Sequence, residues 1–135
     1  MTDLNGGRNL TFKAGDDRKL LPEGEYNIVL ERIEPTSFMG KREVLDFTFY
    51  VVEGPHKGIR VKAFLNSHYE KFSSFTKYHQ WWCIASGRLP EEGEGLSAEA
   101  FFDSVFKAQI ETKTSRKTKL QFSNVTDLLA KIGRF

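Results

Sequence analysis

The sequence predicts a mainly β domain with one α-helix, folded as a five-stranded barrel. Its 135 residues suit a single domain that can bury its own core. Several segments alternate apolar and polar residues, which is the period of a half-buried strand. One segment with helical spacing lies between the third and the fourth of these strands. The resulting order of strand, strand, strand, helix, strand, strand is that of the OB barrel, and it also suits other small α+β sheets.

The body of the domain is expected at residues 21–127, after a flexible arm formed by residues 1–20. Pro22 and Gly24 are typical of a turn, which leads into the first strand. That strand is expected to continue to about Glu34 because apolar residues recur at every second position within it. These alternating apolar residues are Tyr26, Ile28 and Leu30.

The second and third strands have the most regular alternation. Residues 43–53 form the second strand, and a turn bounded by Gly54 and Gly58 leads to the third strand at residues 59–66. The side chains expected to face the core are Leu45, Phe47, Phe49, Val51, Ile59, Val61, Ala63 and Leu65. Those expected on the outer face are Asp46, Thr48, Tyr50, Arg60, Lys62, Phe64 and Asn66.

The α-helix is expected between Ser67 and Gly87. Ser67 and Glu70 form a capping-box pattern, and Gly87 suits the left-handed position that follows a helix. Its predicted buried face comprises Phe72, Phe75, His79, Trp82 and Cys83. Three further aromatic residues fall outside this face and could contact a partner subunit or nucleic acid. We favour packing or self-association for them, with a dimer as the expected homo-oligomer. They are Tyr69, Tyr78 and Trp81.

The remainder of the chain returns to β structure. Ser97 is expected to cap a short second helix before the fourth strand at residues 105–112, and the fifth strand is expected at residues 118–125. Residues 127–132 are predicted to form a final helical turn, within a short C-terminal segment at residues 128–135.

Enzymatic chemistry is not indicated. The three histidines form no HxH or HExxH pattern, and Cys83 has no second cysteine with which to share a metal site or a disulfide. We therefore expect no metal, no cofactor and no catalytic residue. No apolar run approaches the ~20 residues of a membrane span, and the first residues do not resemble a secretory leader. These observations favour a cytoplasmic protein.

Charge and aromatic residues point instead to a ligand. The formal net charge is only +2, but residues 36–88 and 104–135 are basic and residues 89–103 between them are acidic. An OB barrel binds oligonucleotides across its second and third strands and the loops that flank them. There, rings stack on bases and cations contact phosphates. The predicted stacking residues are Phe38, Tyr50 and Phe64. The predicted phosphate contacts are Lys41, Arg42, Arg60, Lys62, Arg116 and Lys117.

These features also have a structural explanation. The arm at residues 1–20 is able to cover rings on the outer face, and basic hairpin tips commonly serve solubility. The ligand interpretation is favoured because the rings and the cations converge on the one face and the two loops that the predicted topology brings together.

Several turn and core motifs resemble those of a known group of proteins. The motifs are Leu21-Pro-Glu-Gly-Glu-Tyr26, Leu45-Asp-Phe-Thr-Phe-Tyr-Val-Val-Glu-Gly54, Lys57-Gly58 and Gly87. Over about residues 21–125 the chain resembles small OB-fold single-stranded-DNA-binding proteins of phages and mobile elements. The resemblance implies sequence-tolerant binding of exposed single strands during replication or recombination, with replication or recombination proteins as partners.

The predicted function is therefore that of a non-enzymatic protein that coats or escorts single-stranded DNA. RNA stays open as a ligand because stacking and phosphate contacts barely discriminate the sugar. The alternative is an accessory or structural protein of a phage or mobile element that binds other proteins through its exposed aromatic residues and binds no nucleic acid.

Overall fold

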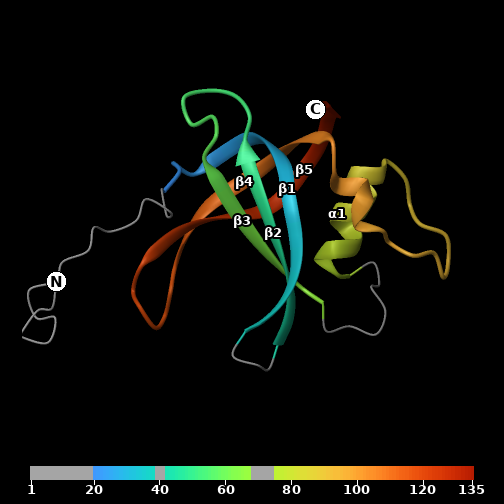
Figure 1. Cartoon of the computed structure of the whole chain (residues 1–135), viewed down its shortest axis with the longest axis horizontal. Helices are drawn as coiled ribbons and strands as arrows, with labels where there is room; N and C mark the ends of the chain where they lie inside the picture. Colours follow the sequence, from blue (N-terminus) through green and yellow to red (C-terminus); the bar gives the residue numbers. More distant parts are fainter. Residues whose placement is uncertain (1–19, 39–41, 68–74) are drawn as a thin grey trace, which may run out of the picture.

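The computed structural model describes residues 20–38, 42–67 and 75–135. The described part of the chain is mainly β, with a five-stranded sheet, one α-helix and one short 3₁₀ turn (Figure 1). The elements are β1 (Gly24–Phe38), β2 (Arg42–Val51), β3 (Arg60–Asn66), α1 (Lys77–Ser86), η1 (Ala98–Phe101), β4 (Ser104–Thr114) and β5 (Gln121–Arg134).

The five strands pair in the order β1-β2-β3-β5-β4, and β1 also pairs with β4, so the sheet closes on itself. The long strand β1 joins two neighbours, because its first residues pair with β4 and the rest pairs with β2. All of these pairs are antiparallel except the contact between β3 and β5, which is parallel and rests on Lys62 and Asn124. Closure gives each strand an inner face toward the core and an outer face.

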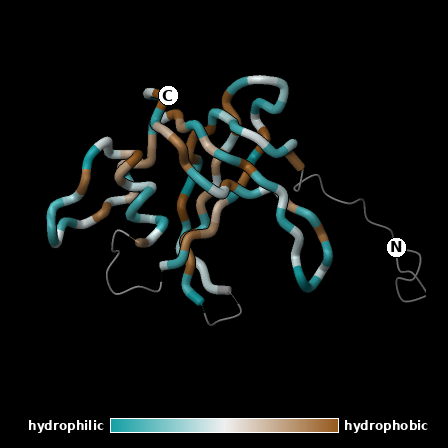
Figure 2. Tube along the Cα trace, turned by 180° about the vertical axis from the view of Figure 1, so that it is seen from behind, coloured by the Kyte–Doolittle hydropathy of each residue, from teal (hydrophilic) through white to brown (hydrophobic). Residues whose placement is uncertain are grey.

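Aromatic rings fill the space between the closed sheet and α1. Phe47 of β2 meets Trp81 of α1 edge-on at 5.8 Å between ring centroids, and it meets Phe101 of η1 edge-on at 5.3 Å. Such edge-to-face contacts add to the hydrophobic gain from burial. Figure 2 shows the underlying pattern, in which hydrophobic and hydrophilic residues alternate along the strands. The predicted inward residues that are buried here are Phe47, Phe49, Val51, Val61, Ala63 and Leu65, while Leu45 and Ile59 are partly buried.

The outer face of β2 differs from the prediction at Thr48. This residue was expected on the surface, but it is only 1% exposed. In the sheet Thr48 lies directly between Arg32 of β1 and Lys62 of β3. A short side chain between two long ones is covered by them, and this explains its burial.

The start of α1 also differs from the prediction. Thr76, not Ser67, is the N-cap, and its hydroxyl accepts a hydrogen bond from the backbone N–H of His79 at 3.3 Å. Ser67 lies at the end of β3 outside any helix, and Glu70 lies outside the described residues. The predicted end is confirmed, since Gly87 adopts φ 76° and its N–H donates to the carbonyl of Cys83 at 2.9 Å.

The later start changes which helix residues face the core. Phe75 was predicted to be buried but precedes the helix and is 92% exposed. Tyr78 and Trp81 were predicted to lie outside the buried face, yet both are buried, which agrees with the packing alternative and not with self-association. The predicted positions of Phe72 and Tyr69 lie outside the described residues. The buried face of α1 consists of Tyr78, Trp81, Trp82 and Ala85.

The predicted helical turn at residues 127–132 is wrong, because β5 continues as one strand to Arg134. The error comes from irregular pairing with β4. Ala108 and Ile110 of β4 are two residues apart, while their partners Leu128 and Val125 are three apart. The extra residue is a β-bulge, and it gives the apolar residues of β5 a spacing that resembles a helix. The short second helix is confirmed as η1, with Ser97 as its N-cap.

Within the described residues, the helical segments are too short and too polar to cross a membrane.

Candidate nucleic-acid interface

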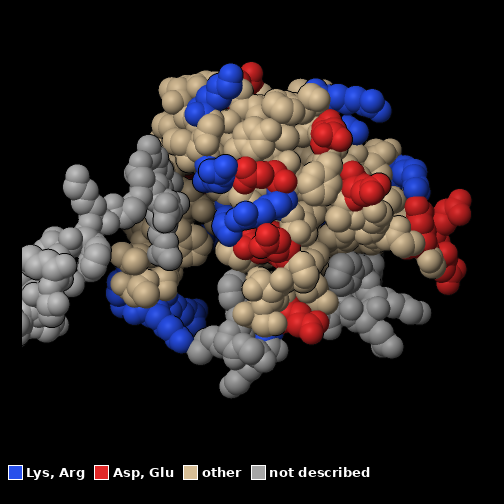
Figure 3. All heavy atoms as spheres, viewed as in Figure 1, with Lys and Arg blue, Asp and Glu red and all other residues tan. Residues whose placement is uncertain are grey.

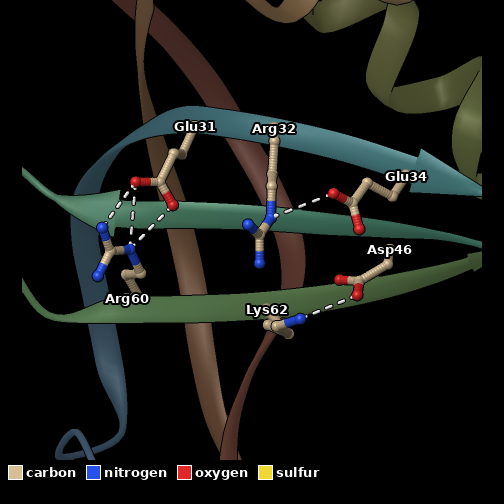
Figure 4. Close-up of polar contacts among 6 residues, drawn as sticks. All are labelled: Glu31, Arg32, Glu34, Asp46, Arg60 and Lys62. Carbon is tan, nitrogen blue, oxygen red and sulfur yellow. Dashed lines mark hydrogen bonds and ion pairs between the residues drawn. The ribbon is translucent and has the colours of Figure 1, made fainter. Parts of the chain in front are cut away.

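The outer surface of β1, β2 and β3 carries charged side chains of both signs, and we call it the charged face. Figure 4 shows the residues that define it in close-up. They are Glu31, Arg32, Glu34, Asp46, Arg60 and Lys62.

Arg60 is held by Glu31 across the sheet. The guanidinium Nε donates to Oε2 of Glu31 at 2.9 Å, and Nη2 donates to Oε1 at 2.9 Å. This two-point geometry is the strongest form of an arginine–carboxylate contact. The hydrogen bond from Arg60 lowers the pKa of the Glu31 carboxyl below its ordinary value, and the same bond raises the pKa of Arg60. Both groups therefore stay charged at neutral pH.

Lys62 is paired with Asp46. Its Nζ lies 2.9 Å from Oδ2 of Asp46 and 6.0 Å from the centre of the Phe64 ring. The ammonium group thus contacts an acid and an aromatic ring at the same time. The third cation of the charged face, Arg32, lies 3.7 Å from Glu34. Each of the three cations therefore has a carboxylate beside it, and the charged face is close to neutral.

The two predicted stacking rings of β2 and β3 have different surroundings. Phe64 is 37% exposed and lies outside the core cluster. Tyr50 is half-buried, and its ring meets that of Phe135 edge-on at 6.1 Å. Part of the Tyr50 ring is therefore covered by the same chain, whereas Phe64 offers a ring surface to solvent.

The predicted residues of the β1–β2 connection are only partly described. Lys41 lies outside the described residues, and of Phe38 only the backbone, as the last residue of β1, is described. Arg42 is the first residue of β2, it is exposed, and it pairs with Phe38 in the sheet register. Phe38 and Arg42 thus lie four paired positions beyond Glu34 and Asp46 of the charged face.

The predicted cations of the β4–β5 connection lie in a separate basic group. Arg116 and Lys117 are exposed at the tip of the hairpin, which is closed by hydrogen bonds between Ser115 and Leu120 and between Lys119 and Ser115. Figure 3 shows this group at the lower left, apart from the mixed charges over the front of the strands. We call it the basic hairpin, and its exposed cations are Lys113, Arg116, Lys117 and Lys119.

Three buried oxygen atoms around Lys62 have no hydrogen-bond partner among the described residues. They are Oδ1 of Asp46, Oγ1 of Thr48 and Oδ1 of Asn124. Thr48 and Asn124 flank Lys62 on the neighbouring strands. Buried polar atoms usually find a partner, so these positions suit an ordered water.

Sequence reasoning placed Asp46 on the outer face but did not recognise it as the partner of Lys62, and it missed Glu31 and Glu34. It counted Arg60 and Lys62 as phosphate contacts without their partners. Glu31 and Glu34 belong to β1, where the pairing with β2 shifts between Leu30 and Arg32. A signal was present, because the regular alternation of β1 breaks after Leu30 into two charged residues in a row.

Sequence reasoning also did not identify a shallow cavity of about 320 Å³ next to Phe135. Phe135 lines this cavity and also meets the Tyr50 ring edge-on. Its other lining residues are Ala100, Phe102, Asp103, Ser104, Lys131 and Arg134.

Metal ligands do not gather in the described part of the chain, where no group of three or more His, Cys, Asp or Glu side chains is placed to hold an ion. No protein-family model matches this chain, and a search of curated proteins finds no match either.

Proposed function

We propose that this protein is an OB-type barrel that binds single-stranded DNA without sequence preference and without catalysing a reaction. In this proposal it protects or escorts single strands during replication or recombination of a phage or mobile element, in the cytoplasm of a bacterial host cell. RNA is the related ligand that the same surface would accept, because rings and cations discriminate poorly between the two sugars.

The order of the elements supports the OB assignment. The closed order β1-β2-β3-β5-β4, with α1 between β3 and β4 in the sequence, agrees with that of OB barrels. In such barrels the strand 2–3 face and the neighbouring loops contact oligonucleotides. The corresponding surface here comprises the charged face and the basic hairpin.

The observation that carries the proposal is the position of Phe64. Its ring is partly exposed on β3, next to Lys62 and opposite Asp46 of β2. An exposed ring beside a cation suits a base and its phosphate, and a stacked base is worth ~1–3 kcal/mol.

The basic hairpin supports the electrostatic part of the proposal. Because the charged face is close to neutral, attraction for a polyanion depends mainly on cations outside it. Lys113, Arg116, Lys117 and Lys119 are exposed within one short connection. A loop of this kind is able to follow a phosphate backbone, and its contribution weakens as salt rises.

A titration tests the proposal. Fluorescent oligo-dT is mixed with the protein at about 50 mM and about 200 mM salt, and anisotropy reports binding. We expect micromolar or tighter binding that weakens with salt, similar binding of oligo-rU, and weaker binding of a duplex of equal length. Absence of oligo-dT binding at the lower salt concentration would refute the proposal.

A second function is favoured by a specific observation. The cations of the charged face are already paired with carboxylates, which weakens their attraction for a polyanion. Phe75 and Leu89 are also 92% and 78% exposed, but single apolar side chains are common on protein surfaces, so the near-neutral charged face is the observation that favours a protein partner. A phage or mobile-element accessory protein that binds proteins and not nucleic acid would give no signal in the oligonucleotide titration.

A further inference from the structure

We infer that Glu31 and Asp46 compete with phosphate groups for Arg60 and Lys62, and that these two carboxylates set the affinity of the charged face for nucleic acid. This inference rests on the proposed function. It assigns a role to two acidic residues in a site whose predicted contacts were all basic or aromatic.

The first part of the argument is geometric. A phosphate offers the same paired oxygen atoms to an arginine as a carboxylate does. Glu31 already occupies the guanidinium of Arg60 through hydrogen bonds of 2.9 Å at Nε and at Nη2. A phosphate that approaches Arg60 in this geometry must therefore displace the Glu31 side chain.

Asp46 acts on Lys62 in the same way. Its Oδ2 lies 2.9 Å from Nζ, and its side chain is only 16% exposed while that of Lys62 is 42% exposed. The ammonium group is thus open to solvent on one side and fixed by the acid on the other. Because the Asp46 side chain is mostly buried, it stays beside Lys62 when a phosphate approaches. Its negative charge then repels the phosphate and weakens the contact with Lys62.

The second part of the argument is energetic. Ion pairs exposed to water are weak, so a phosphate is able to replace a carboxylate beside a cation. Breaking the existing ion pair, however, cancels much of the binding free energy of the new phosphate contact. Each phosphate contact on a single strand contributes about 0.7 to the slope of log affinity against log salt. Over the tenfold fall from ~1 M to ~0.1 M salt, that slope amounts to a factor of about five per contact, so a cation freed from its carboxylate should tighten binding about fivefold at ~0.1 M salt.

The test uses substitutions that remove the charge and keep the shape. Glu31→Gln and Asp46→Asn should each bind oligo-dT about fivefold more tightly at ~0.1 M salt and steepen the salt slope by about 0.7. The matched control is Glu25→Gln, which changes the net charge by the same amount. Glu25 of β1 pairs with Lys107 of β4 at 3.7 Å, outside the charged face. The control should change affinity much less.

A second variant separates a local effect from a general one. The gain of Glu31→Gln should disappear when Arg60→Gln is added, since no freed cation then remains. If Glu31→Gln and Asp46→Asn bind no more tightly than Glu25→Gln, the inference is wrong even though the protein binds DNA. If the unchanged protein and all variants fail to bind, the proposed function itself is wrong. Thermal unfolding midpoints confirm that each variant is folded at the temperature of the titration.

Discussion

Replacing Phe64 with alanine tests the surface on which the proposed function depends. The ring is 37% exposed and does not belong to the core cluster, so its removal opens no cavity in the core. Burial of a whole phenylalanine side chain is worth ~1.5–3 kcal/mol, so about two thirds of that, ~1–2 kcal/mol of folding stability, is at stake. The loss of one stacked base should cost a further ~1–3 kcal/mol of binding, or about 5- to 150-fold in affinity.

Phe75→Ala is the matched control for Phe64→Ala. It removes the same ring, but Phe75 is 92% exposed and lies beside the start of α1. Oligo-dT titrations of both variants, with circular dichroism at the same temperature, separate loss of binding from loss of folding. The reasoning would be refuted if folded Phe64→Ala bound DNA as tightly as Phe75→Ala.

Three other perturbations test the remaining parts of the structure. Replacing Arg116 and Lys117 together with alanine should lower the salt slope of oligo-dT binding by up to about 1.4, and an unchanged slope would remove the basic hairpin from the interface. Trp81→Ala should lower the free energy of unfolding by ~3–5 kcal/mol in a urea titration, because this side chain is 1% exposed; a change below about 1 kcal/mol would contradict its place in the core. The hydrogen bond from Arg88 lowers the pKa of Glu94 from 4.5 to about 2, so this carboxylate stabilises the fold above its ordinary pKa. That stabilisation should fade as the pH falls from about 4.5 toward about 2, and the difference in thermal midpoint between the protein and Glu94→Gln should shrink over the same range.

The strands that follow a regular alternation were predicted well from the sequence. In β2 and β3 every second residue is apolar and faces the core, because one face of each strand packs against α1 and the opposite strands. Phe47 and Val61, for example, lie where the alternation puts them. Such local patterns are informative because the side-chain period of a strand is fixed by its backbone.

The errors arose where tertiary contacts override the local pattern. Val125 and Leu128 are three residues apart because a bulge lengthens β5 relative to β4, and that spacing also suits a helix. Tyr78 and Trp81 were misassigned because the predicted buried face was anchored on residues before Thr76, such as Phe75, which precedes the helix. The capping pattern at Ser67 does not start α1, whereas Ser97 does cap η1 and Gly87 does end α1.

The candidate site was predicted only in part, for an electrostatic reason. Sequence spacing identified Lys62 and Phe64 as outward neighbours, and the structure confirms that they share the outer side of β3. Glu31 and Asp46 were not recognised as their counterparts, because cross-strand ion pairs depend on the register between strands. Register is a long-range property, which composition and local charge do not report.

The meeting of β3 and β5 has a consequence for the mechanics of the protein. In the described residues these strands share a single paired position, Lys62 with Asn124, whereas every other neighbouring pair shares a long ladder. The closed sheet therefore has one weak seam, and slow fluctuations that open it should expose the amides of β3 to hydrogen exchange before those of β2. A nucleic-acid strand bound across Lys62 would contact both β3 and β5. It should therefore slow the opening of the sheet between these two strands.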